Sequence, residues 1–533
     1  MHFIDAIFNK LIKSGYGLVV EHVLAKDETG VRFSLPAQNK MLKNLKDIPA
    51  PVLHVLETLK KNGYGAYIVG GSLRDLILKK EPKDWDITTS ATPGEIVGLF
   101  PKTVYENKYG TVAVVFEDEP ETSSARIVEV TPYRTEGKYT DKRHPDEVIF
   151  TDSLEKDLER RDFTINAMAF SLSDSQVVDP YKGQIDLEKK IIQTVGDPEK
   201  RFEEDALRML RAVRFACELG FAIQHDTILA ISQKAPLLEF ISWERKRDEF
   251  IKIILSPDPM LGLGLLQKLG LLKYVVPELL EGVGCEQKGE HIYDVFEHLL
   301  HALDHAAKKE WPLEVRLSAL FHDIGKPKTR RWDGTKAGGK GKYTFYGHEV
   351  VGARMTAKIL DRFHFSKHVI ERVVNLVRFH MFFSDTETIT LSAVRRTIAN
   401  VGKDYIWELM KVRECDRVGM KKKEAPFRLR KYHAMIEQAL RDPISVAQLK
   451  IDGERLIQMG EKPGPKFSFV LHALLEEVLE DPQKNTELFL EKRATELLAL
   501  PLEELKKIGE SGKEKKAKLE EEEIKKLHKK YGV

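Results

Sequence analysis

The stretch "YIVGGSLRDLILKKEPKDWDITTSATP", residues 67–93, decides the fold class of the first part of this chain. An apolar run enters a double glycine, an amphipathic segment follows, and Asp84 and Asp86 then stand one residue apart. Side chains two apart on a strand point to the same face, so these acids can share a divalent cation or bridge a metal pair. Hard carboxylate oxygens suit Mg²⁺. Ordinary surface acid pairs share this spacing, and the upstream glycines favour nucleotidyl transfer.

The glycine turn predicts a phosphate site. At a strand-to-helix turn, Gly70, Gly71 and Ser72 let backbone N–H groups approach a phosphate chain, and Arg74 adds a cation. A third acid is needed to bind the metal and to deprotonate an attacking hydroxyl. Glu129, on the predicted strand "RIVEVTPYR", is the candidate.

The segment "RFEEDALRMLRAVRF" (201–215) is predicted to be one helix that carries Asp205 and Arg208 on one face. A carboxylate accepts from an exocyclic amine and a guanidinium donates to a ring nitrogen or carbonyl, so the pair can accept C and A and reject U and G. Arg211 and Arg214 continue a basic row suited to triphosphate or RNA backbone. A solvated i,i+3 salt bridge is the alternative for this pair.

A second group of metal-ligating residue types lies on predicted helices further along the chain. Histidines and carboxylates from separate helices suit Mn²⁺, Fe²⁺, Ni²⁺ or Co²⁺ and can activate water. The members are His298, His322, Asp323, His348, His380 and Asp416.

Composition bounds the class of protein. The 533 residues are too many for one core, and the 42% hydrophobic content with a net charge of +2 is that of an ordinary soluble protein. Three separated cysteines favour a reducing compartment. The chain start does not resemble a signal peptide, and no run reaches the ~18 apolar residues of a membrane span. We therefore expect a cytoplasmic protein without a membrane partner.

The first part of the chain, to about residue 180, alternates helical and β-branched runs, and helical periodicity dominates from residue 196. Predicted strands include "GTVAVVF" (110–116) and "ARIVEVTPYR" (125–134). The polar stretch 135–148 is predicted to be a mobile loop, and 330–349 an exposed loop or hairpin. The expected fold class is α+β, a mixed-sheet head followed by all-helical regions.

Four successive segments resemble motifs of the class II tRNA nucleotidyltransferase and bacterial poly(A) polymerase family. They are residues 67–89, "LERRDFTINAMAF" (158–170), "RFEEDALRMLRAVRFACELGF" (201–221) and "WERKRDEF" (243–250). The resemblance spans about residues 38–498. It implies that Gly71 and Arg74 contact the triphosphate, that Asp84 and Asp86 bind Mg²⁺, and that Asp205 and Arg208 read the base. It also places Arg161, Asp162 and Asn166 at the ribose and phosphates, and it associates the loop 135–148 with the switch from C to A addition.

The later histidines and acids resemble the HD phosphohydrolase superfamily. The resemblance implies a four-ligand core of His298, His322, Asp323 and Asp416, with His348 and His380 where binuclear members have further ligands. Lys326, in "HDIGK", is expected to contact phosphate. The implied activity is that of a phosphatase or 2′,3′-cyclic phosphodiesterase. The alternative is an inert, structural remnant.

Taken with the family resemblance, these features predict template-independent addition of C and A to a tRNA 3′ end from CTP and ATP, with the oligomeric state open. An A-adding or CC-adding enzyme, a poly(A) polymerase, an enzyme whose main activity is HD hydrolysis and a non-catalytic RNA-binding scaffold are the alternatives. The expected regions are an unassigned N-terminal region (1–36), a nucleotidyltransferase head (37–180), a nucleotide-selecting and RNA-binding neck (181–285), an HD domain (286–425), a tRNA-binding tail (426–500) and a charged tail (501–533).

Overall fold

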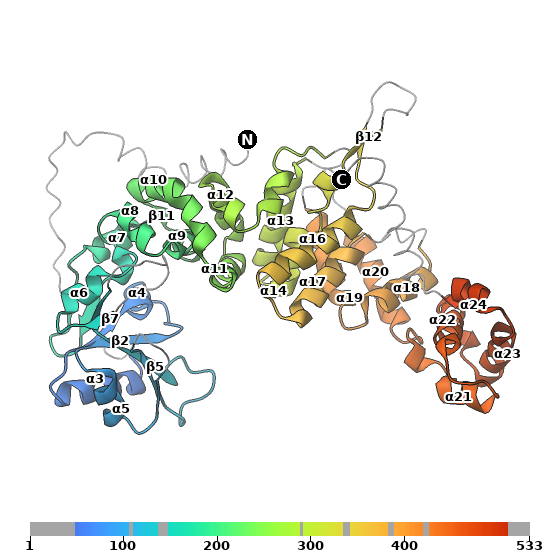
Figure 1. Ribbon diagram of the computed structural model, residues 1–533, viewed down its shortest axis with the longest axis horizontal. Coiled ribbons are helices and arrows are strands. Elements are labelled where there is room, and N and C mark those ends of the chain that lie inside the picture. Colours follow the sequence, from blue (N-terminus) through green and yellow to red (C-terminus); the bar gives the residue numbers. More distant parts are fainter. Residues whose placement is uncertain are drawn as a thin grey trace. The chain divides into compact units, whose positions relative to one another are not determined.

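The computed structural model describes residues 48–105, 110–136, 148–287, 292–333, 342–381, 389–418 and 426–509 (Figure 1). The chain divides into two compact units, Met1–Pro277 and Glu278–Val533, and each is treated separately below. The predicted N-terminal region 1–36, residues 137–147 of the predicted loop and the charged tail beyond residue 509 lie outside the described residues.

Unit 1 contains a seven-stranded sheet. Only β2 and β5 run parallel and every other neighbouring pair is antiparallel, so the predicted mixed sheet is confirmed. The strand order is β3 (Thr103–Tyr105), β4 (Val112–Val115), β5 (Ile127–Pro132), β2 (Trp85–Thr89), β1 (Ala66–Val69), β8 (Ala169–Ser171) and β9 (Gln176–Val178).

Helices cover both faces of this sheet. In Figure 1, α4 (Gly70–Ile77) lies on one side of β2, and α3 (Ala50–Lys61) and α5 (Pro93–Leu99) lie on the other. The inward face of α3 is apolar at helical spacing, and Val52, Leu56 and Leu59 are fully buried. The antiparallel register of β1 with β2 places the glycine turn, which follows β1, beside the strand of the paired acids.

The rest of unit 1 is mainly helical, as predicted. Two short strand pairs, β6 (Arg134–Glu136) with β7 (Val148–Phe150) and β10 (Ile191–Ile192) with β11 (Ala222–Ile223), complete it. The helices are α6 (Leu154–Glu159), α7 (Gly183–Lys189), α8 (Pro198–Glu204), α9 (Leu207–Leu219), α10 (His225–Lys234), α11 (Trp243–Leu255) and α12 (Pro259–Lys268), with 3₁₀ turns η3 (Thr164–Asn166), η4 (Ala235–Phe240) and η5 (Leu272–Tyr274), and η6 (Pro277–Gly282) at the unit boundary.

The prediction of one continuous helix over 201–215 was wrong. The backbone of Asp205 is extended, with φ −141° and ψ 102°, so α8 ends before it and α9 begins two residues after it. The Asp205 carboxylate accepts a hydrogen bond from the backbone N–H of Leu207 at 3.1 Å, as a residue that caps a helix N-terminus does. Asp205 therefore lies at a helix junction.

The described residues of unit 2 are helical apart from one hairpin, which confirms the hairpin alternative for 330–349. Its elements are α13 (Val295–Lys308), α14 (Leu313–Phe321), α15 (Lys326–Thr329), β12 (Arg331–Asp333), β13 (Lys342–Thr344), α16 (His348–Arg362), α17 (Lys367–Phe379), α18 (Leu391–Val401), α19 (Ile406–Asp416), α20 (Pro426–Ala439), η7 (Val446–Gln448), α21 (Gly453–Gln458), α22 (Pro465–Glu480), η8 (Pro482–Lys484), α23 (Glu487–Leu498) and α24 (Leu502–Gly509).

Two separate apolar clusters organise the later part of unit 2. One joins α17, α18, α19 and α20 around Leu376, Ile398 and Ile436. The other joins α21 to α24 around Leu474 and Leu490. Within the described ranges, no helix is long and apolar enough to cross a lipid bilayer.

Candidate functional site

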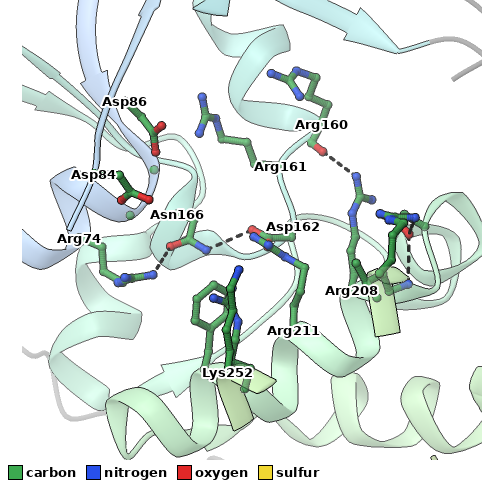
Figure 2. Close-up of a pocket in the computed structure, with 17 residues that line it drawn as sticks. Arg74, Asp84, Asp86, Arg160, Arg161, Asp162, Asn166, Arg208, Arg211 and Lys252 are labelled. Atoms are coloured by element: carbon green, nitrogen blue, oxygen red, sulfur yellow. Dashed lines mark hydrogen bonds and ion pairs between the residues drawn. The ribbon is translucent and has the colours of Figure 1, made fainter. Parts of the chain in front are cut away.

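Unit 1 contains a polar cavity of about 460 Å³ between the sheet and helices α9 and α11 (Figure 2). Its charged lining residues are Arg74, Asp84, Asp86, Arg160, Arg161, Asp162, Asp205, Arg208, Arg211, Arg214, Arg245 and Lys252. Cations outnumber acids in this lining, so the cavity suits an anionic ligand such as a nucleoside triphosphate.

The paired acids lie at one end of the cavity (Figure 2). Asp86 is on β2 and Asp84 directly precedes the strand. Burial raises the pKa of Asp86 to about 6, the charge of Asp84 acts in the same direction, and nearby arginines oppose it. A bound divalent cation would stabilise both ionised carboxylates, so the donors fit Mg²⁺.

Glu129 lies beside this pair. The parallel register pairs Asp86 of β2 with Glu129 of β5, and registered residues on neighbouring strands point to the same face. Glu129 is not among the residues that line the cavity itself. The structure therefore places the predicted third acid next to Asp86 on the neighbouring strand.

The backbone of the glycine turn lies close to the side chains of Asp86 and Arg161. Gly70 has φ +69°, and a Cβ atom there would lie 3.1 Å from Oδ2 of Asp86 and 3.3 Å from Nη1 of Arg161. At Gly71 a Cβ atom would meet only Nη2 of Arg74, at 3.6 Å. A side chain at Gly70 would thus crowd the acids, whereas Gly71 lines the cavity with room to spare.

Ser72, predicted to offer its backbone N–H to a phosphate chain, has a side chain that links the glycine turn to β2. Its side chain is fully buried, its Oγ donates to the carbonyl of Val69 at 2.7 Å, and it accepts from the backbone N–H of Asp86 at 3.3 Å. The hydroxyl therefore ties the glycine turn to the strand of the acids and does not line the cavity.

A chain of hydrogen bonds crosses the cavity (Figure 2). Arg74 donates to Oδ1 of Asn166 at 3.0 Å, Asn166 donates to Asp162 at 3.2 Å, and Arg211 donates to Asp162 at 2.7 Å. Burial alone would raise the pKa of Asp162, but Arg211 and these hydrogen bonds lower it to about 2. Asp162 is therefore ionised at neutral pH. It orients the Arg211 side chain directly and the Arg74 side chain through Asn166.

The predicted base-reading residues both line the cavity, but the structure pairs them with other partners. The Asp205 carboxylate accepts two hydrogen bonds from Arg245, at 2.7 and 3.2 Å. Arg208 donates to Glu204 at 2.6 Å and to the carbonyl of Arg160 at 3.1 Å. Among the described residues, the i,i+3 salt bridge offered as the alternative does not form.

The two remaining arginines of the predicted basic row are held by acids. Nε of Arg214 lies 2.8 Å from Glu249 and its guanidinium lies 4.3 Å from the centre of the Phe215 ring. Arg211 pairs with Asp162. Both line the cavity, so the prediction that they can meet phosphate is compatible with their placement.

Several residues of this site were not found from the sequence. Arg245 and Glu249 belong to the segment 243–250, which was quoted for its resemblance without assigning roles to its residues. Asp157 is fully buried and binds Arg160 at 2.8 Å, Arg161 at 3.1 Å and Thr88 of β2 at 3.2 Å. Only the tertiary structure shows that one carboxylate holds two arginines of the cavity against the strand of the acids.

We expect Asp157→Asn to weaken the binding of a nucleoside triphosphate about ten- to a hundredfold, because Arg160 and Arg161 lose their common anchor. Titration with nucleoside triphosphate measures this effect, and circular dichroism verifies the fold. Glu159→Gln, an exposed position on the same helix, is the matched control. Unchanged affinity in the folded Asp157→Asn variant would contradict the anchoring role.

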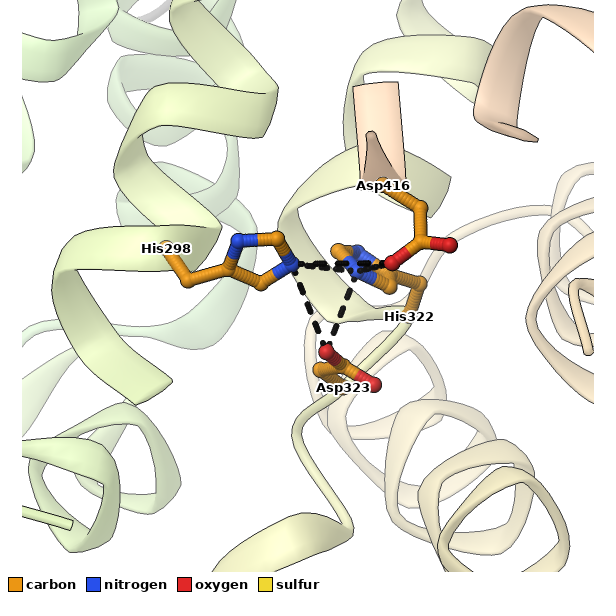
Figure 3. A group of neighbouring side chains, drawn as sticks. All are labelled: His298, His322, Asp323 and Asp416. Carbon is orange, nitrogen blue, oxygen red and sulfur yellow. Dashed lines mark hydrogen bonds and ion pairs between the residues drawn. The ribbon is translucent and has the colours of Figure 1, made fainter. Parts of the chain in front are cut away.

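Unit 2 brings the second predicted group of ligands together (Figure 3). Nε2 of His298 lies 3.1 Å from Nε2 of His322, 3.4 Å from Oδ2 of Asp323 and 3.7 Å from Oδ1 of Asp416. All four side chains are buried and converge from α13, the end of α14 and the end of α19. The sequence prediction that these four residues meet is confirmed.

A second group shares Asp323 with the first. Its other oxygen, Oδ1, lies 3.1 Å from Nε2 of His348 and 3.6 Å from Nε2 of His380. His348 begins α16 and His380 follows α17. The six predicted ligands thus form two adjoining sets with one carboxylate between them, as a binuclear centre requires.

The histidines are oriented for metal binding. Nδ1 of His322, His348 and His380 each lies 2.7–2.8 Å from a backbone carbonyl three residues earlier. Since a carbonyl only accepts, each Nδ1 carries a proton, which leaves Nε2 as the nitrogen that can bind a metal when the ring is neutral. Nε2 of His348 and of His380 are buried and make no well-formed hydrogen bond to a described residue. Imidazole with carboxylate fits a transition metal.

The negative charges of the buried Asp323 and Asp416 are neutralised by protonated His322 and by Lys326. Burial opposes a charged ring, but Asp323 and Asp416 raise the pKa of His322 to about 10. Lys326, predicted to contact phosphate, lies 2.5 Å from Asp323 and donates to Gln287 at 2.6 Å. A divalent cation would replace the His322 proton on binding, because only the neutral ring is a ligand.

Comparison with known proteins assigns the class of each region. A poly A polymerase head domain model matches residues 66–193, a model for the probable RNA and SrmB-binding site of polymerase A matches 220–282, and an HD domain model matches 289–421. The fold and the cavity therefore define a nucleotidyltransferase-type head joined to an RNA-binding segment and an HD domain.

Named relatives agree with that class. The chain is 42% identical over 289 residues to a CCA-adding enzyme of Geobacillus thermodenitrificans, a match that covers 52% of this chain and 65% of the relative. It is 47% identical over 224 residues to the CCA-adding enzyme of Geobacillus kaustophilus, covering 42% and 54%. The matched part thus spans between about half and two thirds of the curated relatives.

Solved structures extend the comparison. The Bacillus stearothermophilus CCA-adding enzyme in complex with CTP superposes with a TM-score of 0.63 at 29% identity, over 84% of this chain and 99% of that one. The Thermotoga maritima CCA-adding enzyme complexed with tRNA shares the fold, with a TM-score of 0.52 at 18% identity, over 85% and 97%. The chain is thus similar to class II CCA-adding enzymes, in its three matched domains and in its fold.

Proposed function

We propose that this protein adds C and A to the 3′ end of tRNA from CTP and ATP without a nucleic-acid template. The observation that carries the proposal is one cavity that joins paired acids, a row of arginines and the Asp205 and Arg208 side chains. The similarity to CCA-adding enzymes, including one solved with CTP, supports the choice of substrates.

The chain's own residues divide the chemistry between them. Arg74, Arg161 and Arg211 bind the triphosphate, and Glu129 accepts the proton of the attacking 3′-hydroxyl. That oxygen forms a bond to the α-phosphorus as the bond to pyrophosphate breaks. Asp84 and Asp86 would hold Mg²⁺, which would supply positive charge to stabilise the attacking and leaving oxygens.

Base selection is compatible with the observed pairing of Asp205 and Arg208. A carboxylate offers about four lone-pair sites, so Asp205 can accept from an exocyclic amine while Arg245 holds it. Arg208 uses three donor contacts in the described structure, to Glu204 and to two backbone carbonyls. A guanidinium has five N–H donors, so two remain for a ring nitrogen or carbonyl.

Three tRNA substrates test the proposal: one without the terminal CCA, one ending in CC and one already complete. We expect C, C and A on the first with both nucleotides present, A alone on the second, and nothing on the third. Addition of A alone would identify an A-adding enzyme, and addition that stops at C a CC-adding enzyme. Long A tails would identify a poly(A) polymerase, and no incorporation on any substrate would favour an RNA-binding scaffold.

Replacing Asp205 by alanine should relax base selection. We expect incorporation of U and G relative to C and A to rise about ten- to a hundredfold, because the repulsion between the carboxylate and the carbonyl oxygens of U and G is removed. Single-turnover incorporation with each nucleotide measures the ratio. Glu203→Gln, an exposed neighbour, is the control. Unchanged selectivity would mean that Asp205 does not read the base.

We also propose that the HD domain is a metal-dependent phosphohydrolase acting as a phosphatase or 2′,3′-cyclic phosphodiesterase on RNA ends. The observation that favours this second function is the pair of ligand sets that share Asp323. Mn²⁺, Fe²⁺, Ni²⁺ or Co²⁺ at this centre would activate water and polarise the phosphate. Lys326 would move from Asp323 to the substrate phosphate, since a metal takes over the charge of that carboxylate.

A further inference from the structure

The hairpin β12–β13 joins the two halves of the HD centre. It begins two residues after the end of α15, whose first residue, Lys326, pairs with Asp323. It ends four residues before His348. The carbonyl of Phe345, between the hairpin and α16, accepts the hydrogen bond that orients His348. The segment that contains the hairpin therefore contacts the HD centre at both ends, through Lys326 with Asp323 and through Phe345 with His348. A ligand on the hairpin would be held next to that centre.

Aromatic and basic side chains gather on the hairpin and directly beyond it. Trp332 and Tyr343 are register partners, and their ring centres lie 4.9 Å apart in an edge-to-face arrangement. The guanidinium of Arg330 covers the Tyr343 ring at 3.7 Å from its centre. Trp332 is 61% exposed, and Tyr346, just beyond β13, is 78% exposed. Arginine stacked on aromatic rings that face solvent is a surface on which unpaired nucleobases stack.

From this arrangement we infer that Arg330, Trp332, Tyr343 and Tyr346, called here the stacking face, bind the last unpaired nucleotides of an RNA 3′ end and present its terminal phosphate to the HD centre. The inference rests on the proposed phosphohydrolase function and defines its substrate as single-stranded RNA. Base stacking is tolerant of sequence, so the face would accept 3′ ends of any sequence.

A protein partner is the other occupant that exposed aromatic residues could serve. The charge next to the aromatic residues favours RNA, because Arg330 and Arg331 directly precede Trp332. The neighbouring centre is also built for a phosphate ligand. A single-stranded RNA end would use both the exposed aromatic residues, for its bases, and the HD centre, for its phosphate.

The test compares two substrates with the full-length, Mn²⁺-loaded chain. One is a tetranucleotide RNA ending in a 2′,3′-cyclic phosphate, and the other is glycerol 1,2-cyclic phosphate, which has no base. In Trp332→Ala/Tyr346→Ala we expect the KM for the tetranucleotide to rise at least about tenfold, with kcat little changed. Hydrolysis of the glycerol substrate should be unchanged. Trp332→Phe/Tyr346→Phe, which keeps the rings, should behave like the original chain.

A binding measurement separates this inference from the function on which it rests. If the unmodified chain hydrolyses neither substrate, the phosphohydrolase function fails, and anisotropy of a labelled tetranucleotide 3′-phosphate still tests the face. We expect the alanine variant to weaken that binding at least about tenfold. Equal KM and equal binding in the alanine and phenylalanine variants would overturn the inference. Loss of a dimer in the alanine variant with unchanged RNA binding would also overturn it, in favour of a protein partner.

Discussion

Asp84→Asn/Asp86→Asn should abolish nucleotide incorporation, lowering kcat/KM by at least about a thousandfold. Both side chains line the cavity at the glycine turn, and together they are the acids on which the proposed Mg²⁺ site depends. Asparagine keeps their shape and removes both charges. Incorporation of labelled CTP into a tRNA that lacks CCA measures the loss.

The metal-free fold should tolerate this change. Burial and the neighbouring acid raise the pKa of Asp86 to about 6, so its ionised form is disfavoured in the folded chain. Removing both charges relieves that repulsion, and we expect a melting temperature no lower than that of the original chain. HD-dependent hydrolysis should be unaffected. Substantial incorporation by the folded double variant would show that the acids are not essential.

Asp323→Asn should abolish hydrolysis at the HD centre, by at least about a thousandfold, and should lower metal content at both ligand sets. Asp323 is the only residue common to the two sets, and each of its oxygens lies within 3.6 Å of two histidine Nε2 atoms. An amide is a weaker ligand and cannot neutralise two cations. Elemental analysis and hydrolysis of a 2′,3′-cyclic nucleotide measure the two effects.

Asp323→Asn also removes the carboxylate that pairs with the buried Lys326, which could destabilise the fold. A second variant that keeps Asp323 is therefore needed. His348→Ala/His380→Ala removes only the second set, and we expect it to reduce metal content by about half. Nucleotide incorporation should be unchanged in both variants, since every residue of the nucleotide cavity belongs to unit 1. Full hydrolysis by folded, metal-free Asp323→Asn would mean that the centre is structural.

Local patterns were sufficient to predict the parts of the fold that depend on neighbouring residues. The strand before Gly70 follows from an apolar run that ends at two glycines, and the strand of Glu129 follows from its β-branched residues. The convergence of the HD ligands was also predictable, since histidine and acid types recur at helix ends in a recognisable order. The roles of these residues stay predictions.

The sequence could not reveal the break at Asp205. The spacing of Asp205 and Arg208 is compatible with an uninterrupted helix, and it is the pairing of Asp205 with Arg245, forty residues later, that accompanies the extended backbone. Asp157 was missed for the same reason. Its partners on β2 and at the end of α6 meet only in the folded unit, and no local pattern marks a buried carboxylate.

The central claim is that a protein surface, with no complementary strand, selects C and then A. The most direct measurement is to incubate a tRNA lacking CCA with the full chain, Mg²⁺ and all four nucleoside triphosphates at equal concentration, and to sequence the 3′ ends. We predict ends that stop at CCA, with U and G rare. Ends of mixed sequence or long A tails would contradict the account.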